Sequence, residues 1–141
     1  MTIKEIQQEI IEEFSMFDDW MDRYEYIIDL GKSLPIINDK FKLDENLIKG
    51  CQSKVWLYSE LENETIKYSA DSDAILTKGI AAILLRVYSG QKPADILTTE
   101  TNFIDEIGLK EHLSPTRANG LVSMIKQIKL YAIAQQTKLV N

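Results

Sequence analysis

The sequence has 141 residues, of which 45% are hydrophobic and 27% are charged. This length and near-average composition are typical of one globular domain with a hydrophobic core, and they argue against a disordered or membrane-embedded chain. The net charge of −6 disfavours nucleic acid as a partner, because nucleic-acid-binding surfaces need an excess of Lys and Arg. We therefore expect a soluble protein with a single domain over residues 1–141.

Cysteine and histidine each occur once, as Cys51 and His112. A single thiol excludes an internal disulfide, and the two residues together are too few for a zinc or iron–sulfur site, so we expect no metal and no bound cofactor. The first residues lack the apolar core of a signal peptide, and no apolar run approaches the roughly 20 residues needed to span a membrane. These features favour the cytoplasm, where thiols stay reduced.

Two amphipathic helices are predicted at the N-terminus. Apolar residues recur at three- and four-residue spacing over residues 3–14, and Thr2 with Glu5 has the form of a capping box. The second helix begins near residues 18–19 and ends at Gly31.

A β-hairpin follows a mostly irregular connection over residues 33–46. Residues 55–61 and 65–70 alternate between apolar and polar side chains, and residues 62–64 form the turn between them. Residues 47–50 are a candidate for a third short strand, although a glycine weakens this prediction.

The C-terminal half is predicted to be helical. Residues 74–88, preceded by Ser72-Asp73 as an N-cap pair, are apolar nearly all round, which indicates a helix in the middle of the domain. Shorter helices are predicted over residues 93–97 and 102–107, and a final helix from Ser114-Pro115 to about Gln136. Helices, a hairpin and further helices together predict an α+β fold, with the helices packed on one face of a small antiparallel sheet.

Cys51 lies between the irregular connection and the first strand, in the string Gly50-Cys51-Gln52-Ser53. Loops held between rigid elements often carry functional thiols. Gly50 allows the backbone to turn, and Gln52 and Ser53 supply polar groups and amides that could stabilise a thiolate or a persulfide anion. The alternative is structural, since a free cysteine commonly serves as a small buried hydrophobe.

Residues 50–56, Gly-Cys-Gln-Ser-Lys-Val-Trp, resemble the signature of the SufE family of sulfur-acceptor proteins, in which the cysteine carries a persulfide. Two more segments match the same family in the same order. They are Ser-Asp-Ala at residues 72–74 followed by Lys-Gly-Ile at 78–80, and residues 112–121. Thr116 and Ile80 depart from the more usual Ser and Leu, and neither departure affects the thiol chemistry.

The resemblance implies an α+β fold similar to that of the IscU scaffold. It also implies that Cys51 accepts sulfane sulfur as a persulfide from a pyridoxal-phosphate (PLP) cysteine desulfurase, SufS-like, and stimulates that enzyme. The sulfur would then pass to an iron–sulfur scaffold complex, SufBCD-like. The PLP cofactor belongs to the partner, so the chain is a carrier and not an enzyme. We expect the Cys51 loop to shield the persulfide and to swing out on docking, with Gly50 as the pivot.

Three other residues in the matched segments are candidates for the site. A guanidinium near a thiolate favours its charged form, so Arg117 is a candidate supporting residue, against the alternative of an exposed first-turn arginine. Asp73 is either an N-cap or a partner contact. His112 either supports local structure or acts as a base for Cys51.

Two other functions remain open from the sequence. A Cys–His hydrolase would use Cys51 as nucleophile and His112 as base, although no protease signature surrounds either residue. In a pure binding module, Cys51 would be structural only.

Overall fold

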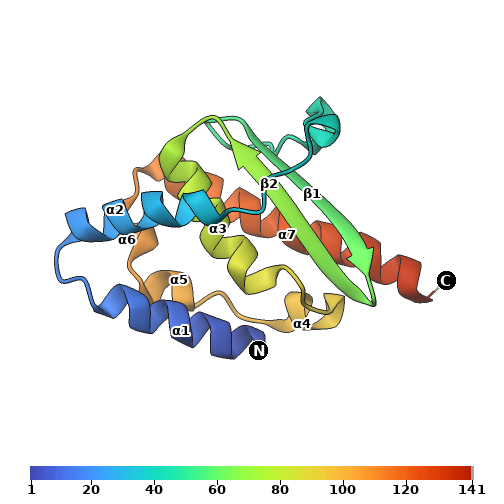
Figure 1. Ribbon diagram of the computed structural model, residues 1–141, viewed down its shortest axis with the longest axis horizontal. Helices are drawn as coiled ribbons and strands as arrows, with labels where there is room; N and C mark the ends of the chain where they lie inside the picture. The colour runs from blue at the N-terminus through green and yellow to red at the C-terminus, as the bar shows by residue number, and fades with distance from the viewer. Residues whose placement is uncertain (141) are drawn as a thin grey trace.

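The computed structural model describes residues 1–140 (Figure 1). Over these residues the chain forms seven α-helices, two β-strands and three short 3-10 turns, and the α+β class is confirmed. The elements in chain order are α1 (Ile3–Ser15), α2 (Trp20–Leu30), η1 (Gly31–Ser33), η2 (Asp39–Phe41), η3 (Asp44–Asn46), β1 (Val55–Glu62), β2 (Thr65–Ser72), α3 (Ile75–Tyr88), α4 (Pro93–Thr98), α5 (Phe103–Glu106), α6 (Leu109–His112) and α7 (Pro115–Val140).

The first two helices begin as predicted. The Thr2 hydroxyl accepts a hydrogen bond from the Glu5 amide, and the Glu5 carboxylate accepts one from the Thr2 amide, so the capping box is confirmed. The Asp19 side chain caps α2. At the other end of α2, Gly31 keeps a right-handed conformation, and the chain continues into the 3-10 turn η1 before it changes direction.

The predicted hairpin is confirmed, with strands that extend slightly beyond the predicted bounds. β1 and β2 pair antiparallel from Val55 opposite Ser72 to Glu62 opposite Thr65. The turn consists of residues 63–64, both with positive φ, which is the geometry that matches the twist of two paired strands. One face of the hairpin is buried, and it carries Val55, Leu57, Ser59, Ile66, Tyr68 and Ala70.

Residues 47–50 do not form a third strand. They make one isolated bridge, in which Leu47 lies opposite Trp56 and the Ile48 amide donates to the Val55 carbonyl at 2.8 Å. Gly50 then adopts a φ of +92°, which takes the chain out of the extended conformation. Pairing therefore ends after one bridge.

The irregular connection bonds to the edge of β2 at residues 35–37 and covers the other face of the hairpin at residues 41–42. The ring of Phe41 stacks on Tyr58 with centroids 3.8 Å apart. The Lys42 ammonium lies 5.4 Å from the centre of the Trp56 ring and forms an ion pair with Asp71 at 2.6 Å. The residues that the periodicity left unassigned are thus held against the sheet.

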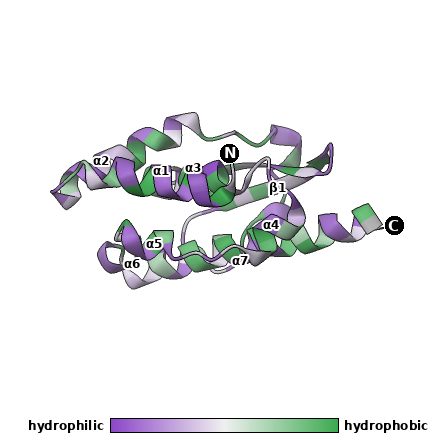
Figure 2. Cartoon of the chain, turned by 90° about the horizontal axis from the view of Figure 1, so that it is seen from below, coloured by the Kyte–Doolittle hydropathy of each residue, from purple (hydrophilic) through white to green (hydrophobic). Residues whose placement is uncertain are grey.

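Helix α3 occupies the centre, as predicted, and ten of its fourteen residues are buried. It contacts α1, α2, β2 and α7. Figure 2 shows α7 along the lower edge of the molecule, with α1, α2 and α3 above it. The Tyr68 hydroxyl donates to the Ile128 carbonyl at 2.7 Å, and the Tyr131 hydroxyl donates to the Leu57 carbonyl at 3.1 Å, so α7 is fastened to both strands.

The predicted N-cap of α3 is wrong. The N-cap position is Ala74, whose side chain forms no cap, because Ser72 still belongs to β2. Asp73 instead joins the two strands at their base. Its carboxylate accepts from the Lys54 amide at 3.1 Å, and its own amide donates to the Lys54 carbonyl at 3.3 Å.

The helices after α3 are partly as predicted. The helix that was expected over residues 102–107 is confined to α5, and Gly108, with a φ of +78°, separates it from the unpredicted α6. Four-residue helices have no periodicity to detect. Ser114 caps α7 as expected, since its hydroxyl accepts from the Arg117 amide, and α7 continues past Gln136. No helix within residues 1–140 combines the length and apolar character needed to cross a membrane.

Candidate functional site

Cys51 lies on a short loop that is fastened at both ends. Ile48 is bonded to Val55 at one end, and Lys54 is bonded to Asp73 at the other. Between these points the thiol donates a hydrogen bond to the Gly120 carbonyl of α7, with a sulfur–oxygen distance of 3.6 Å. This contact is weak, because sulfur is a poor donor. Cys51 itself is half-buried.

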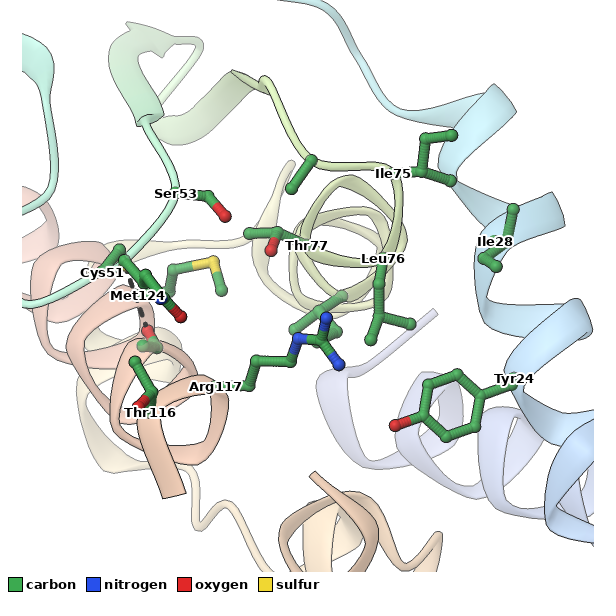
Figure 3. Close-up of a pocket in the computed structure, with 14 residues that line it drawn as sticks. Tyr24, Ile28, Cys51, Ser53, Ile75, Leu76, Thr77, Thr116, Arg117 and Met124 are labelled. Atoms are coloured by element: carbon green, nitrogen blue, oxygen red, sulfur yellow. Dashed lines mark hydrogen bonds between the residues drawn. The ribbon is translucent and has the colours of Figure 1, made fainter. Parts of the chain in front are cut away.

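The thiol opens into a cavity of about 490 Å³ that four segments enclose. These segments are α2, the Cys51 loop, the start of α3 and the start of α7 (Figure 3). The lining residues are Tyr24, Ile28, Cys51, Gln52, Ser53, Ala74, Ile75, Leu76, Thr77, Ile80, Thr116, Arg117, Gly120 and Met124. The lining mixes apolar side chains with uncharged polar ones, and Arg117 is its one residue with a fixed charge.

Arg117 projects from the first turn of α7 into this cavity, toward the start of α3 (Figure 3). Its side chain is exposed and takes part in no ion pair within residues 1–140. Tertiary structure thus brings Arg117 and Cys51 into one cavity although 65 positions separate them in the chain. The guanidinium is available to an anion that enters.

Burial raises the pKa of the Cys51 thiol above its ordinary value. Burial disfavours the thiolate because a charge loses hydration when it leaves water. The guanidinium of Arg117 does not offset this effect in the present conformation. At neutral pH the thiol is therefore protonated and weakly nucleophilic, since the thiolate is the reactive form.

The residues next to Cys51 have two different properties: Gly50 has a backbone conformation that favours glycine, and Gln52 and Ser53 have amides without an acceptor in the described chain. At Gly50 the φ of +92° strains any other residue, and an added Cβ would lie 2.6 Å from the Ser123 hydroxyl oxygen. Gln52 and Ser53 line the cavity, and within the described part of the chain no group accepts a hydrogen bond from either amide. Both amides are available to a ligand.

His112 is not placed to act on Cys51. Its imidazole stacks on the Trp20 ring, with centroids 4.0 Å apart, and its carbonyl accepts a hydrogen bond from the Tyr24 hydroxyl at 3.2 Å. His112 is not among the residues that line the cavity. The histidine thus fastens α6 to α2, and the arrangement that a Cys–His hydrolase needs is absent from residues 1–140.

Several lining residues were not identified from the sequence. Tyr24 and Ile28 come from α2, whose position is set by its packing on α3, and no local motif marks them. Ile75 directly follows the Ser-Asp-Ala string, and this position was the signal in the sequence, whereas its 67% exposure at the start of α3 is known only from the structure. Gly120, within the matched segment 112–121, was another.

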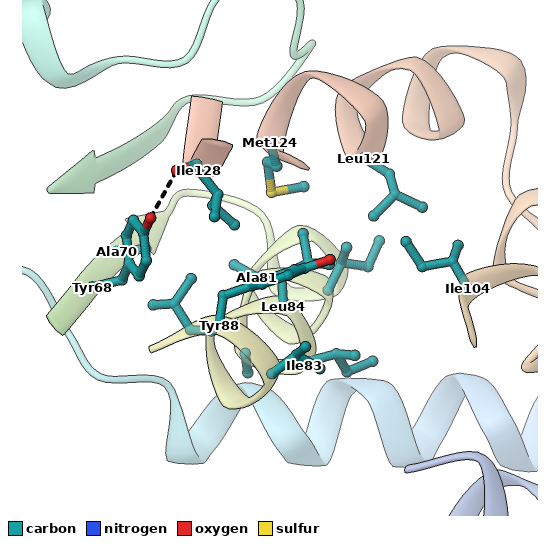
Figure 4. Packing of buried hydrophobic residues seen from close by; sticks show 14 of the residues in the cluster. Tyr68, Ala70, Ala81, Ile83, Leu84, Tyr88, Ile104, Leu121, Met124 and Ile128 are labelled. Atoms are coloured by element: carbon teal, nitrogen blue, oxygen red, sulfur yellow. Dashed lines mark hydrogen bonds between the residues drawn. The ribbon is translucent and has the colours of Figure 1, made fainter. Parts of the chain in front are cut away.

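The floor of the cavity is continuous with the hydrophobic core. Met124 lines the cavity and also packs in the core beside Leu121 and Ile128 of the same helix (Figure 4). Ile80 of α3 has the same double role. The loop therefore rests on a rigid, close-packed base, while its outer side is open.

The site residues do not form a metal centre. Within residues 1–140 no three His, Cys, Asp or Glu side chains lie close enough together to hold a metal ion.

The sequence matches the model of the SufE family, described as an Fe-S metabolism associated domain, over residues 8–132. A SufE-like protein of Rhizobium meliloti (strain 1021), itself uncharacterized, is 40% identical over 126 residues, which cover 86% of this chain and 90% of that protein. SufE-like protein 1 of Arabidopsis thaliana, chloroplastic/mitochondrial, is 37% identical over 93% of this chain and 36% of its own length.

The fold is shared with a protein of known structure. The solution structure of a hypothetical protein from Thermus thermophilus superimposes with a TM-score of 0.78 at 18% identity, over 94% of this chain and 96% of that one. With the family model spanning most of the chain and relatives at about 40% identity, this protein belongs to the SufE family, which is associated with iron–sulfur metabolism.

Proposed function

We propose that this protein is a sulfur acceptor and carrier that holds one sulfane sulfur on Cys51 as a persulfide. The observation that carries the proposal is the position of the single thiol of the chain. Cys51 lies on a loop at a cavity that Arg117 also lines, next to Gln52 and Ser53, whose amides have no acceptor within residues 1–140. A one-sulfur carrier needs one thiol and a shielded site beside it.

The transfer step is a thiol–persulfide exchange. The Cys51 thiolate attacks the terminal sulfur of a donor persulfide, R–S–SH, and forms Cys51–S–SH while the donor leaves as R–S⁻. One sulfur–sulfur bond forms and one breaks, so no oxidant or reductant is consumed. The donor is the active-site cysteine of a PLP-dependent cysteine desulfurase, SufS-like, and the PLP belongs to that enzyme.

The raised pKa of Cys51 suits a carrier that should react only when docked. Protonated and half-buried, the thiol is protected from unspecific chemistry. Within residues 1–140 the thiol forms one hydrogen bond, to the Gly120 carbonyl, and this bond is weak. Docking of the desulfurase therefore releases the loop at little cost, with Gly50 as the pivot.

After transfer, the cavity stabilises the product. A persulfide is more acidic than a thiol and is an anion at neutral pH. Arg117, Gln52 and Ser53 line the same cavity and supply a guanidinium and two amides without an acceptor in the described chain. We infer that they hold the persulfide anion until it is delivered.

Removal of the persulfide frees the desulfurase for another turnover, so the carrier stimulates that enzyme. The sulfur then passes to an iron–sulfur scaffold complex, SufBCD-like. A thiol that must remain reduced between transfers fits a reducing compartment such as the cytoplasm.

The test is intact-mass analysis after incubation with a PLP-loaded cysteine desulfurase and cysteine. We expect the wild-type chain to gain the mass of one sulfur atom and Cys51→Ser to gain none. Alanine production by the desulfurase on its own shows that the donor is active. An active desulfurase and an unmodified wild-type chain would contradict the proposal.

A second variant separates the carrier from a hydrolase. His112→Ala removes the imidazole that stacks on Trp20 and leaves the cavity lining intact. A carrier keeps its sulfur uptake in this variant, whereas a Cys–His hydrolase loses its base.

A further inference from the structure

Charge is distributed very unevenly along the chain. The last acidic residue is Glu111, and the remaining residues carry four of the sixteen Lys and Arg and none of the 22 Asp and Glu. Their side chains therefore sum to +4, and those of residues 1–111 sum to −10. Helix α7 occupies nearly all of the basic part.

The outward side of α7 combines these charges with exposed apolar residues. Val122 is 49%, Leu130 47% and Ile133 50% exposed. Together with Ile125, Lys126 and Lys129 they line a groove of about 360 Å³, which Thr101 and Lys110 border on the other side. We call Val122, Ile125, Lys126, Lys129, Leu130 and Ile133 the basic face of α7.

The basic face is not occupied by the rest of the chain. None of the ion pairs within residues 1–140 includes Lys110, Lys126 or Lys129. In Figure 2 the helix lies along the lower edge of the molecule, and the α1, α2 and α3 helices lie above it. The groove shares no lining residue with the Cys51 cavity.

We propose that the basic face of α7 docks an acidic amphipathic helix of a partner protein. Val122, Lys126, Lys129 and Ile133 are spaced by four, three and four residues, so they lie along one side of α7. From Val122 to Ile133 the face is about 17 Å long, enough for about three turns of a partner helix. Apolar anchors in the groove and Glu or Asp toward the lysines match both features of the face.

Other occupants fit the charges less well. A second copy of this chain would bring the lysines of two basic faces together, which is repulsive. An anionic membrane or a nucleic acid would attract α7 but repel the remaining residues, with their net −10. An acidic helix is small enough to contact the basic face alone.

The basic face lies apart from the Cys51 cavity, and this separation has a functional consequence. A partner held there leaves the Cys51 cavity uncovered, so docking and sulfur transfer can occur on the same molecule at the same time. This consequence rests on the proposed sulfur-carrier function, whereas the docking itself does not.

The experiment uses the full chain, labelled with ¹⁵N, and a synthetic helical peptide with Leu at every third or fourth position and Glu on both flanks. We expect amide shifts confined to residues 99–110 and 118–137. In Lys126→Glu/Lys129→Glu the binding should weaken by roughly tenfold or more. Lys4→Glu/Lys92→Glu makes the same charge change at two exposed lysines outside the groove, and it should bind as the wild type does.

Three outcomes would overturn the proposal. They are the absence of shifts at millimolar peptide, equal binding of the peptide with Glu replaced by Lys, and binding of vesicles containing anionic lipid but not of the peptide. Sulfur uptake by Cys51 should be unchanged in Lys126→Glu/Lys129→Glu. The docking proposal can therefore fail without affecting the sulfur-carrier proposal, and the reverse also holds.

Discussion

Two regions of this molecule each contain a pair of glycines that other parts of the chain approach closely. One region is the crossing of α2 and α3, and the other is the surroundings of Cys51. At the crossing of α2 and α3, an added Cβ on Gly79 would lie 2.7 Å from the Ile27 carbonyl carbon, and one on Gly31 would lie 3.1 Å from the Gly79 nitrogen. Around Cys51, a Cβ on Gly50 would meet the Ser123 hydroxyl, and one on Gly120 would lie 3.5 Å from the thiol sulfur.

The difference lies in what the added methyl would touch. At the helix crossing it meets backbone of a neighbouring helix, which cannot move without separating two core elements. Near the cysteine, a methyl group on Gly50 meets the Ser123 side chain, which can rotate. A methyl group on Gly120 lies at an ordinary contact distance from the Cys51 sulfur. The first pair thus sets the architecture, and the second leaves room where the chemistry is proposed to occur.

The largest effect is expected at the helix crossing. Gly79→Ala should lower the free energy of unfolding by about 3 kcal/mol, because overpacking forces α2 and α3 apart. Denaturant unfolding followed by circular dichroism measures this change. A loss smaller than about 1 kcal/mol would show that the crossing tolerates a side chain and would remove the contrast between the two regions.

Gly50→Ala should cost less, about 2 kcal/mol, through its positive φ and its clash with Ser123. Adding Ser123→Ala removes the hydroxyl and should recover the steric part but not the backbone part. The comparison of both single variants with the double variant separates the two contributions. If the double variant is no more stable than Gly50→Ala, the clash contributes nothing.

Gly120→Ala makes the same change inside a helix as Gly79→Ala does, but we expect the opposite effect on stability. It should raise the free energy of unfolding by up to about 1 kcal/mol, because alanine is the better helix former. The new methyl also takes space beside the Cys51 sulfur, so uptake of sulfur measured by mass should slow several-fold. Unchanged uptake would mean that this space has no role in the transfer.

The smallest effect concerns the acidity of the thiol. The raised pKa of Cys51 means that the folded protein holds less thiolate at any pH below that pKa than the unfolded chain does. The alkylation rate with iodoacetamide should therefore reach its midpoint at a higher pH in the folded protein than in urea, where the midpoint should return to the ordinary value of about 8.5. An equal midpoint in both states would mean that burial does not tune the thiol.

Long periodic segments were predictable and short or non-local ones were not. The helices α1, α2, α3 and α7 and the hairpin follow from spacing that repeats over two turns or several strand residues. The N-cap of α3 was predicted wrongly, because cross-strand pairing of Ser72 with Val55 extends β2 through a residue with good capping character. Residues 109–112 are too few to show a period at all.

For the candidate site, the sequence by itself determined the thiol and its immediate setting. The sequence motifs at residues 50–56 and 112–121 are recognisable without a structure, and they contain Gly50, Cys51 and Arg117. They are recognisable because loop chemistry and helix capping depend on neighbouring residues in the chain. Only the tertiary structure decided which of the candidate residues lie near Cys51. The packing of α7 put Gly120 against the cysteine and Arg117 in the same cavity, whereas the stacking of His112 on Trp20 took the one histidine out of the site. Those outcomes depend on contacts between residues far apart in the chain, which no local pattern encodes.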